Sequence, residues 1–316
     1  MNLRNCGLGA FFFFVTSLGG QAKEEVKANL NEIKHPVKPM LWKIEGNGLK
    51  NASYLFGTLH IADPRVTTLH PLAQQAFDAS QAVYTEVDFS PAKQLAAVKF
   101  YLRDGDETLE QLVGKETVMA LDAELKAINA ALGVKPFKKM KVWMLAFMVP
   151  QIESQLGGKL PLDMQLWQRA NKAGKKTAAL ETFEGQLGQL DKLTAEEQKE
   201  LLVMTLKLLK ISRERKVDPY QTIIDAYLLG DEVAIEKEMS KTSFMGLKMN
   251  PETNKKLLSL LLEGRNKGMA NTIQETLKSL DAETHFFAAG AAHYIGDMSV
   301  NKLLQDAGYT VTRVLK

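Results

Sequence analysis

Strand-like segments at the two ends of the chain constrain its fold more than any other sequence feature. Segments with the composition and length of a strand lie at 40–46, 53–59, 82–88, 285–290 and 309–315. The first two flank Asn47-Gly48, a dipeptide typical of tight hairpin turns. The sequence therefore predicts an N-terminal hairpin and a sheet that joins both ends of the chain.

The middle of the chain is predicted to be helical. From Pro91 to about Gly174, and again over 183–280, apolar residues recur at three- and four-residue spacing. Only the short run TAAL at 177–180 is typical of a strand between these two stretches. We therefore predict a mixed α/β (α+β) domain, in which a central sheet built from the N- and C-terminal regions carries a large helical insertion.

The N-terminus has the features of a secretory signal peptide. An early arginine, the apolar run GLGAFFFFVTSLGG and the small-residue site GQA follow one another within residues 1–22. We predict cleavage near Ala22, an N-terminal linker over 23–38, a single domain over 39–316, and a periplasmic or secreted protein. An uncleaved membrane anchor is the alternative, but the apolar run is short for a span, which needs about 20 residues.

The amino-acid composition argues against cysteine chemistry, a further membrane span and a nucleic-acid partner. Cys6 is the only cysteine and lies in the predicted signal peptide, so the mature chain is expected to use neither disulfides nor thiolates. After that peptide no apolar stretch is long and charge-free enough to span a bilayer. A formal net charge of +3 is too small to indicate a nucleic-acid partner.

Two similar segments carry the strongest functional signal. In YLFGTLHIAD (54–63) an apolar run meets Gly57, and His60 follows three positions later. In FFAAGAAHYI (286–295) the same order recurs with Gly290 and His293. Either glycine could adopt a positive φ or allow a close backbone approach, and so aim its histidine over the edge of the sheet.

Carboxylates follow other predicted strands. Glu86 and Asp88 end the segment 82–88, and Glu181 follows the run TAAL. The carboxyl ends of strands are where ligand sites form in sheets with helical crossovers. Two imidazoles and a carboxylate are a usual ligand set for a catalytic divalent metal.

Each of these residues also has a structural interpretation. A single histidine near a strand end is more often a hydrogen-bonded polar residue than a ligand. Glu86 and Asp88 could be exposed positions, and Glu181 could cap the next helix. The remaining histidines lack the paired pattern and are interpreted as structural or surface residues: His35, His70 and His285.

The sequence resembles the TraB/GumN family, which includes the Tiki-type metalloproteases. The resemblance covers about residues 40–316 and is carried by two G-x-x-H motifs, an E-x-D block and the LET and RN blocks. The matching stretches are YLFGTLHIAD, HPLAQQAFDASQAVYTEVD, LPLDMQLWQRANKAGKKTAALETFEGQLGQLDKL, EGRNKGMANTIQE and FFAAGAAHYIGDMSVNKLLQDAGYTVTRV.

The resemblance implies a sheet with inserted helices, similar to erythromycin esterase (EreA) and haem-binding ChaN-like proteins. It also implies a protease that depends on manganese or cobalt. The residues that Tiki-type members require carry over to His60, His293 and Glu86. Arg265 falls in the RN block and Glu181 in the LET block, which implies that both belong to the site.

The leading hypothesis is a secreted or periplasmic metal-dependent peptidase. His60 and His293 would bind the metal, and Glu86 would be either a third ligand or the base that activates water. Arg265 would stabilise the oxyanion, while Asp88 and Glu181 would orient the histidines. The alternatives are a non-catalytic protein that sequesters a peptide or haem, and an esterase-like hydrolase without metal. The substrate, the metal and the oligomeric state stay open.

Overall fold

A computed structural model describes residues 30–279 and 282–315 of the chain. The contacts divide the chain into two units, Met1–Lys34 and His35–Lys316. In the described part of the first unit, 30–34, Leu30 is helical and Asn31 and Glu32 form a turn. The predicted signal peptide and the first part of the predicted linker lie outside the described residues. Within the described ranges, no helix has both the length and the apolar character needed to cross a membrane.

The predicted N-terminal hairpin is present. Strand β1 (Leu41–Gly46) pairs antiparallel with β2 (Ser53–Thr58), with Leu41 opposite Phe56. Gly46, Asn47 and Gly48 all have positive φ, at 80°, 48° and 83°. Glycine and asparagine tolerate this conformation best, so the sequence of the turn sets the register of the hairpin.

The predicted joining of the two chain ends is also present. The sheet has the order β4-β3-β7-β2-β1-β8, and its other strands are β3 (Ala82–Thr85), β4 (Lys176–Ala179), β7 (His285–Gly290) and β8 (Tyr309–Arg313). Strand β7 lies between β3 and β2 and is parallel to both, and β4 is parallel to β3. Four parallel strands therefore end at one edge of the sheet, while β1 and β8 complete it as antiparallel strands.

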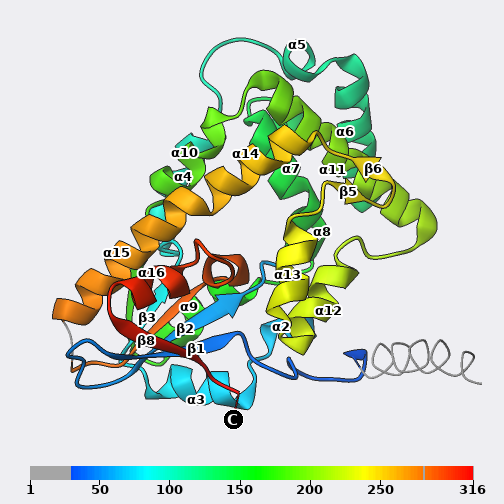
Figure 1. Cartoon of the computed structure of the whole chain (residues 1–316). Helices are drawn as coiled ribbons and strands as arrows, with labels where there is room; N and C mark the ends of the chain where they lie inside the picture. The colour runs from blue at the N-terminus through cyan, green and yellow to red at the C-terminus, as the bar shows by residue number, and fades with distance from the viewer. Residues whose placement is uncertain (1–29, 280–281, 316) are drawn as a thin grey trace, which may run out of the picture. The chain divides into compact units, whose positions relative to one another are not determined.

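Helices fill the connections between the strands, as Figure 1 shows. The helices that precede β4 are α2 (Pro64–Thr67), α3 (Pro71–Ala79), α4 (Pro91–Tyr101), α5 (Leu109–Val113), α6 (Lys115–Ile128), α7 (Val142–Met148), α8 (Ile152–Leu156) and α9 (Leu162–Lys172). Those that follow it are α10 (Phe183–Gly188), α11 (Ala195–Arg215), α12 (Gln221–Leu229), α13 (Glu232–Met239), α14 (Pro251–Leu261), α15 (Glu263–Ser279) and α16 (Val300–Asp306). Short 3₁₀ turns lie at η1 (Lys135–Phe137), η2 (Val149–Gln151), η3 (Leu190–Lys192) and η4 (Ala291–Tyr294), and a small hairpin joins β5 (Ser243–Phe244) to β6 (Leu247–Lys248).

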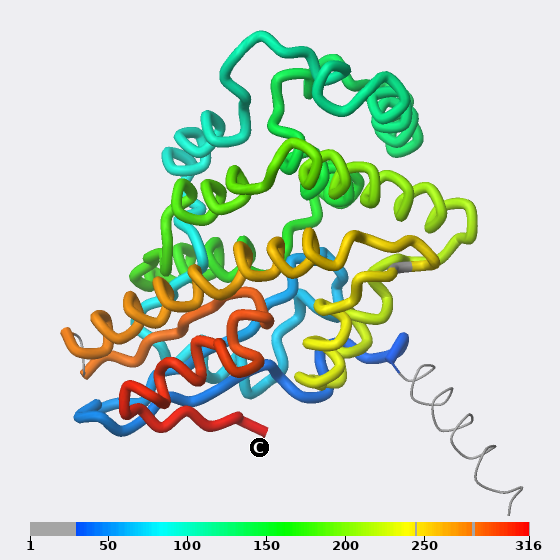
Figure 2. Tube along the Cα trace, turned by 45° about the horizontal axis from the view of Figure 1, so that its top comes forward, coloured from blue at the N-terminus to red at the C-terminus, as the bar shows by residue number. Residues whose placement is uncertain are grey.

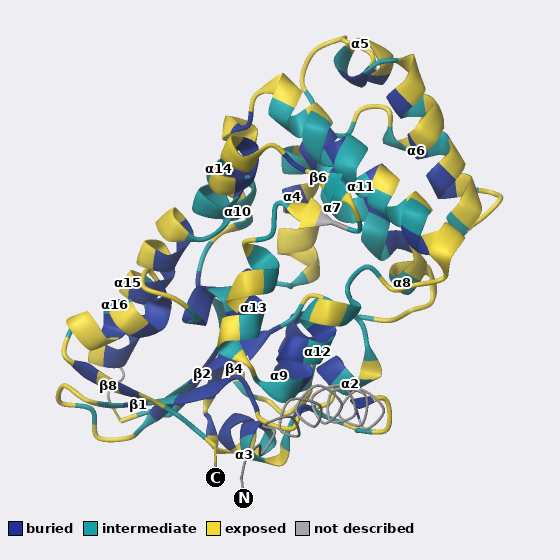
Figure 3. Cartoon of the chain, turned by 45° about the vertical axis from the view of Figure 1, so that its right-hand side comes forward, coloured by how far each residue is buried: buried dark blue, intermediate teal, exposed yellow. Residues whose placement is uncertain are grey.

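Separate hydrophobic clusters support the sheet and the inserted helices. Against one face of the sheet, α3 and α9 pack Phe77 and Leu166 onto Phe56 and Phe286. The inserted helices α5, α6, α7 and α11 share a second cluster of their own. Figure 3 shows the buried residues in dark blue along the strands and on one face of many helices. The mixed α/β class with a helical insertion is thus confirmed, while the likeness to erythromycin esterase and ChaN-like proteins stays a prediction.

One strand boundary differs from the sequence-based expectation. The segment 82–88 was expected to be a strand to its end, but β3 stops at Thr85. Glu86 and Asp88 therefore lie in the loop beyond the strand. Glu86 is 4% exposed and leaves the sheet at the edge where β2 and β7 also end.

Candidate active site

The two G-x-x-H segments meet because their strands are neighbours. Gly57 of β2 lies opposite Ala289 of β7, and Thr58 lies opposite Gly290. Figure 2 shows the two strands side by side, β2 in blue and β7 in orange. Both histidines leave the sheet at the same edge. Nε2 of His60 lies 3.3 Å from Oε1 of Glu86, and Nε2 of His293 lies 3.8 Å from the same oxygen.

Both glycines allow a close approach, and neither needs a positive φ. A Cβ on Gly57 would lie 2.9 Å from Cα of Ala291, so η4 can pack on β2 only where no side chain intervenes. A Cβ on Gly290 would lie 3.2 Å from Oε1 of Glu86 and 3.3 Å from Nε2 of His60. The φ of Gly290 is −50°, which any residue can adopt. The glycines therefore give the site room rather than a special turn.

Helical residues anchor each histidine through Nδ1. Oδ1 of Asp163, in the first turn of α9, lies 3.2 Å from Nδ1 of His60. Oδ1 of Asn266, on α15, lies 2.6 Å from Nδ1 of His293, while Nδ2 of Asn266 donates to the carbonyl of Met298. A carbonyl or carboxylate oxygen only accepts, so each Nδ1 carries a proton. Each ring thus turns Nε2 toward Glu86, as in sites where imidazole binds a metal.

Glu86 is fixed by donors on both of its oxygens. Oε1 accepts the N–H of Gly290 at 2.6 Å. Oε2 accepts hydrogen bonds from Arg265 at 2.5 Å and from Gln186 at 2.8 Å. Burial alone would raise the pKa of Glu86, but the two histidines and Arg265 outweigh it and hold this pKa well below 4.5. Glu86 is therefore a carboxylate near neutral pH.

The two histidines differ in charge. Burial lowers the pKa of His293 to about 4, so this imidazole is neutral near pH 7. Burial also opposes charge on His60, but Asp163 and Glu86 outweigh it and hold the pKa of His60 well above 6.5. The side chain of His60 is 48% exposed, so solvent screens these interactions. A proton on Nε2 of His60 consequently occupies the space between the ring and Glu86.

Arg265 joins Glu86 to a second buried carboxylate. Nε of Arg265 donates to Glu181 at 2.9 Å, and Nη2 contacts both Glu181 and Glu86. Nη1 donates to the carbonyl of Leu261. Burial, together with the nearby charge of Glu86, raises the pKa of Glu181 although Arg265 opposes the shift. These contacts favour a role for Arg265 in holding Glu86 over the oxyanion role expected from the sequence.

The residues that orient the histidines differ from those expected. Oδ1 of Asp88 accepts the N–H of Ser90 at 2.8 Å, in the turn that leads into α4. Glu181 contacts Arg265 and Gln186. Asp163 and Asn266 occupy the anchoring positions instead. Sequence reasoning missed both, although Asn266 directly follows Arg265 in the RN block and Asp163 lies in the LPLD stretch.

The other histidines have structural contacts. Nδ1 of His70 accepts the N–H of Leu72 and caps α3. His35 lies edge-on to His70, with 5.2 Å between the ring centroids. His285 is fully buried at the start of β7, at the opposite end of the strand from Gly290. These positions agree with the interpretation of the three histidines as structural or surface residues.

The donor set at the edge of the sheet fits a divalent cation in kind. A tetrahedral cation about 2.1 Å from each ligand atom places neighbouring ligand atoms about 3.4 Å apart. The two Nε2 atoms lie 3.3 Å and 3.8 Å from Oε1 of Glu86, close to that spacing. Across residues 30–279 and 282–315, however, no group of three or more His, Cys, Asp or Glu side chains is already assembled as a metal site. The described residues therefore supply suitable donor types without forming a complete metal-binding group as they stand.

Fold and site together define a mixed α/β protein with two histidines and a glutamate at the carboxyl edge of its parallel strands. The chain belongs to the TraB/PrgY/gumN family, whose sequence model matches residues 40–313. The resemblance inferred from the sequence blocks is thereby confirmed.

Several metalloproteases are similar to the chain over most of its length. Metalloprotease TIKI1 of Xenopus tropicalis is 23% identical over 92% of this chain and 64% of its own. Metalloprotease TIKI1 of Danio rerio is 25% identical over 89% and 64%, and the TIKI homologue of Nematostella vectensis is 25% identical over 83% and 64%. The chain thus spans just under two thirds of the length of these relatives. No solved structure matches it.

Proposed function

We propose that this protein is a metal-dependent peptidase whose cation is held by His60, His293 and Glu86. The observation that carries the proposal is the convergence of two Nε2 atoms on Oε1 of Glu86, with both Nδ1 atoms anchored from behind. The names of the relatives support a divalent metal and a peptide or protein substrate. Manganese or cobalt is the metal that we propose.

A bound divalent cation would supply an acidified water and polarise the scissile carbonyl. The protein's own residues supply orientation and charge. Asp163 and Asn266 hold the imidazoles with Nε2 directed toward Glu86, where a cation would compete with the proton of His60. Arg265 and Gln186 occupy Oε2 of Glu86, which leaves Oε1 as the oxygen that faces the histidines.

The lowered pKa of Glu86 favours its role as a ligand. A general base works best when its pKa lies near the working pH, and a carboxylate well below 4.5 accepts protons poorly. A cation ligand has the opposite requirement, because it must stay charged. We therefore propose Glu86 as the third ligand rather than the base.

Export to the periplasm or the cell exterior completes the proposal. It rests on the charge, the apolar run and the small-residue site of residues 1–22. Protein purified from its native host should begin near Lys23. A soluble cytosolic form that keeps Met1 would contradict export but would not bear on the proposed metal site.

A peptide-binding protein without turnover is the second candidate. The observation that favours it is the full set of protein donors on Glu86, since Gly290, Arg265 and Gln186 already satisfy a carboxylate that needs no cation. In that case the histidines would contact the bound peptide directly.

Incubation with a diverse peptide library separates the two candidates. The purified protein would be tested with manganese, with cobalt and with a chelator, beside His60→Ala, His293→Ala and Glu86→Gln. We expect cleavage that needs metal and that all three variants lose. Glu86→Gln keeps the shape of the side chain, so a loss of metal affinity in this variant identifies a ligand. Metal binding without any cleavage by the wild type would favour the second candidate, and full activity of the three variants would refute the assignment.

A further inference from the structure

A cavity of ≈ 500 Å³, here called the α14 cavity, lies beside the candidate active site. Its walls come from the end of α13, from α14, from the start of α15 and from the loop that follows His293. Asn266, which anchors His293, lines this cavity together with Ala292, the neighbour of His293 in the chain. The α14 cavity therefore adjoins the segment that carries His293, on the side where Asn266 holds Nδ1 of the ring.

The α14 cavity has an excess of negative charge. The carboxylates of Glu236, Glu263 and Asp297 line it, against the single ammonium group of Lys255. Within the described residues neither Glu236 nor Asp297 forms an ion pair, and Glu263 accepts one hydrogen bond, from Ser259. Oε1 of Glu236 lies 3.1 Å from where a Cβ on Gly296 would be, so this carboxylate sits over the backbone that leads into Asp297.

A buried amide also faces the α14 cavity. Asn254, on α14, is 8% exposed and lines the cavity. Among the residues that the structure describes, its side-chain amide has no hydrogen-bond partner. The amide atoms of Asn254 remain accessible from the cavity, so a ligand there can complete their hydrogen bonds. This observation is independent of the carboxylates.

Part of the remaining wall of the α14 cavity is apolar, beside the hydroxyl side chains of Ser240, Thr242 and Ser259. Leu258 and Leu262 contribute from the α14 side, and Ile295 and Met298 from the loop after η4. Lysine and arginine suit such a wall, because they bury an aliphatic stem along apolar surface while the charged head reaches polar groups. A small inorganic cation would gain nothing from these contacts.

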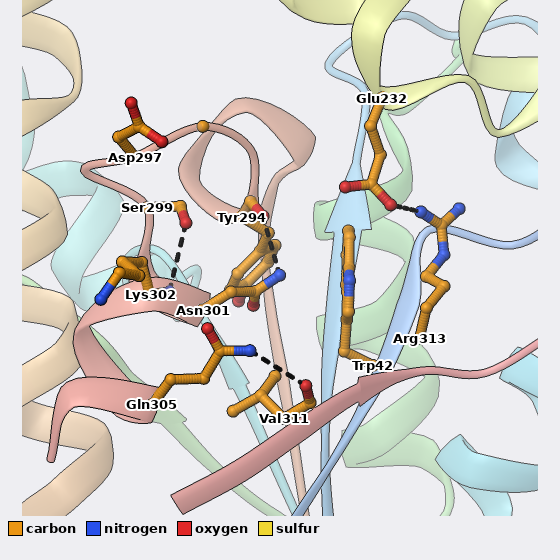
Figure 4. Close-up of a pocket in the computed structure, with 11 residues that line it drawn as sticks. Trp42, Glu232, Tyr294, Asp297, Ser299, Asn301, Lys302, Gln305, Val311 and Arg313 are labelled. Carbon is orange, nitrogen blue, oxygen red and sulfur yellow. Dashed lines mark hydrogen bonds and ion pairs between the residues drawn. The ribbon is translucent and has the colours of Figure 1, made fainter. Parts of the chain in front are cut away.

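A second cavity provides a contrast. It has a volume of ≈ 350 Å³ and shares Gly296 and Asp297 with the first. Figure 4 shows that Glu232 and Arg313 form an ion pair there, and that Gln305 donates to the carbonyl of Val311. Because its principal acid and base neutralise each other, this second cavity offers less uncompensated charge than the α14 cavity.

We propose that the α14 cavity receives a lysine or arginine side chain of the peptide substrate, next to the bond held at His293. The carboxylates of Glu236 and Asp297 would meet the cationic head, and the amide of Asn254 would accept one of its hydrogen bonds. This specificity rests on the proposed peptidase function. It adds a substrate class that the metal site by itself does not select.

Two readouts on the purified protein test this inference. The first is cleavage of a positional peptide library with manganese present. The second is the binding, in chelator, of fluorescent peptides that carry arginine or its neutral isostere citrulline at one position. Both are repeated with the triple variant Glu236→Gln, Glu263→Gln, Asp297→Asn and with Asn254→Leu. Glu275→Gln, which removes an exposed carboxylate elsewhere on α15, is the matched control.

We expect lysine and arginine to be enriched at one position near the cleaved bond. The triple variant should reduce this preference by about tenfold, since several partly exposed charges together contribute on the order of 1.4 kcal/mol. Asn254→Leu should reduce it several-fold, and Glu275→Gln should leave it unchanged. Cleavage with no basic preference would overturn the inference and leave the peptidase standing.

The binding readout keeps the two proposals separable. If nothing is cleaved but arginine peptides bind better than citrulline peptides, and the triple variant abolishes the difference, the α14 cavity stands and the peptidase fails. If arginine and citrulline peptides bind equally, or the triple variant changes nothing, the inference is refuted.

Discussion

The amide N–H of Gly290 donates to Oε1 of Glu86 across 2.6 Å, so the backbone of the second G-x-x-H segment holds the carboxylate that both histidines face. The absence of a side chain at Gly290 makes this contact available, because a Cβ there would lie 3.2 Å from the same oxygen. The glycine and the histidine of this segment thus act on one carboxylate.

Gly290→Ala should weaken metal binding while the fold persists. The added methyl group displaces Glu86 and His60, whose Nε2 would be 3.3 Å away, and the φ of −50° imposes no backbone strain. The neighbouring atoms must move by a few tenths of an ångström, and disturbing the groups that position ligands costs about 10–100-fold, so we expect about a tenfold loss of manganese affinity by calorimetry. Gly268→Ala on α15, where nothing lies within 4 Å, is the control and should bind normally. Equal affinity of the two variants would refute this role.

Asp163→Ala and Asn266→Ala should each reduce metal affinity by about 10–100-fold, the usual cost of losing the group behind a ligating histidine. Each change frees Nδ1 of one imidazole and with it the orientation of Nε2. Asp88→Ala serves as the comparison, because Asp88 binds Ser90 instead. Calorimetric titration with metal would measure the affinity of the three variants. A loss of affinity in Asp88→Ala alone would support the sequence-based prediction that Asp88 orients the histidines.

The contrast between Asp88 and Asp163 shows how far sequence reasoning reaches. His60, Glu86 and His293 each follow a short apolar strand, and parallel neighbours such as β2 and β7 bring their ends to one edge. That pattern is local and can be predicted. Asp163 lies on an inserted helix, and helical periodicity does not say which polar residue a tertiary contact turns toward the sheet. Its role therefore emerges only from the packing of α9 against the sheet.

The hairpin and the loop after β3 show the same difference within the fold, between features set by local sequence and features set by tertiary contacts. Gly46, Asn47 and Gly48 specify a turn by their own backbone preferences, so β1 and β2 could be predicted from the chain. The end of β3 could not, because Glu86 leaves the strand to meet Arg265, a residue far away in the sequence.

Manganese should raise the melting temperature of the wild type but not of His60→Ala or His293→Ala. A ligand that binds only the folded state at 100 times its Kd contributes about 2.7 kcal/mol. Protons compete for both imidazoles, so the shift should shrink as the pH falls. Because the pKa of His60 lies above 6.5, the competition should already be visible somewhat above that pH. A shift that both alanine variants retain would place the metal elsewhere.

Gly57→Ala should destabilise the fold rather than the site alone. The added Cβ would meet Cα of Ala291 at 2.9 Å and Cβ of Met40 at 3.0 Å, and backbone atoms cannot rotate away as a side chain can. Overpacking of this kind costs roughly 1–3 kcal/mol in the free energy of unfolding, measurable by urea denaturation. Gly188→Ala, with nothing within 4 Å, is the matched control. Wild-type stability of Gly57→Ala would mean that η4 does not pack on β2 as described.

Arg265→Met should destabilise the protein in a way that depends on pH. The change leaves two buried carboxylates, Glu86 and Glu181, without their shared cation, which costs on the order of 3–5 kcal/mol near neutral pH. The pKa of Glu181 is already raised, by burial and then by Glu86, and should rise further without Arg265. A carboxyl whose pKa is raised in the folded state stabilises that state below its unfolded pKa of about 4.5, and this contribution is lost as the pH rises through the folded value. The stability deficit of Arg265→Met should therefore be smallest near pH 4.5 and grow toward pH ~7.

Arg103→Met is the control, since Arg103 donates to the carbonyls of Met140, Glu107 and Lys138, and its deficit should not change with pH. Urea denaturation of both variants over this pH range gives the measurement, and a deficit of Arg265→Met that stays constant would show that Arg265 does not neutralise the two glutamates.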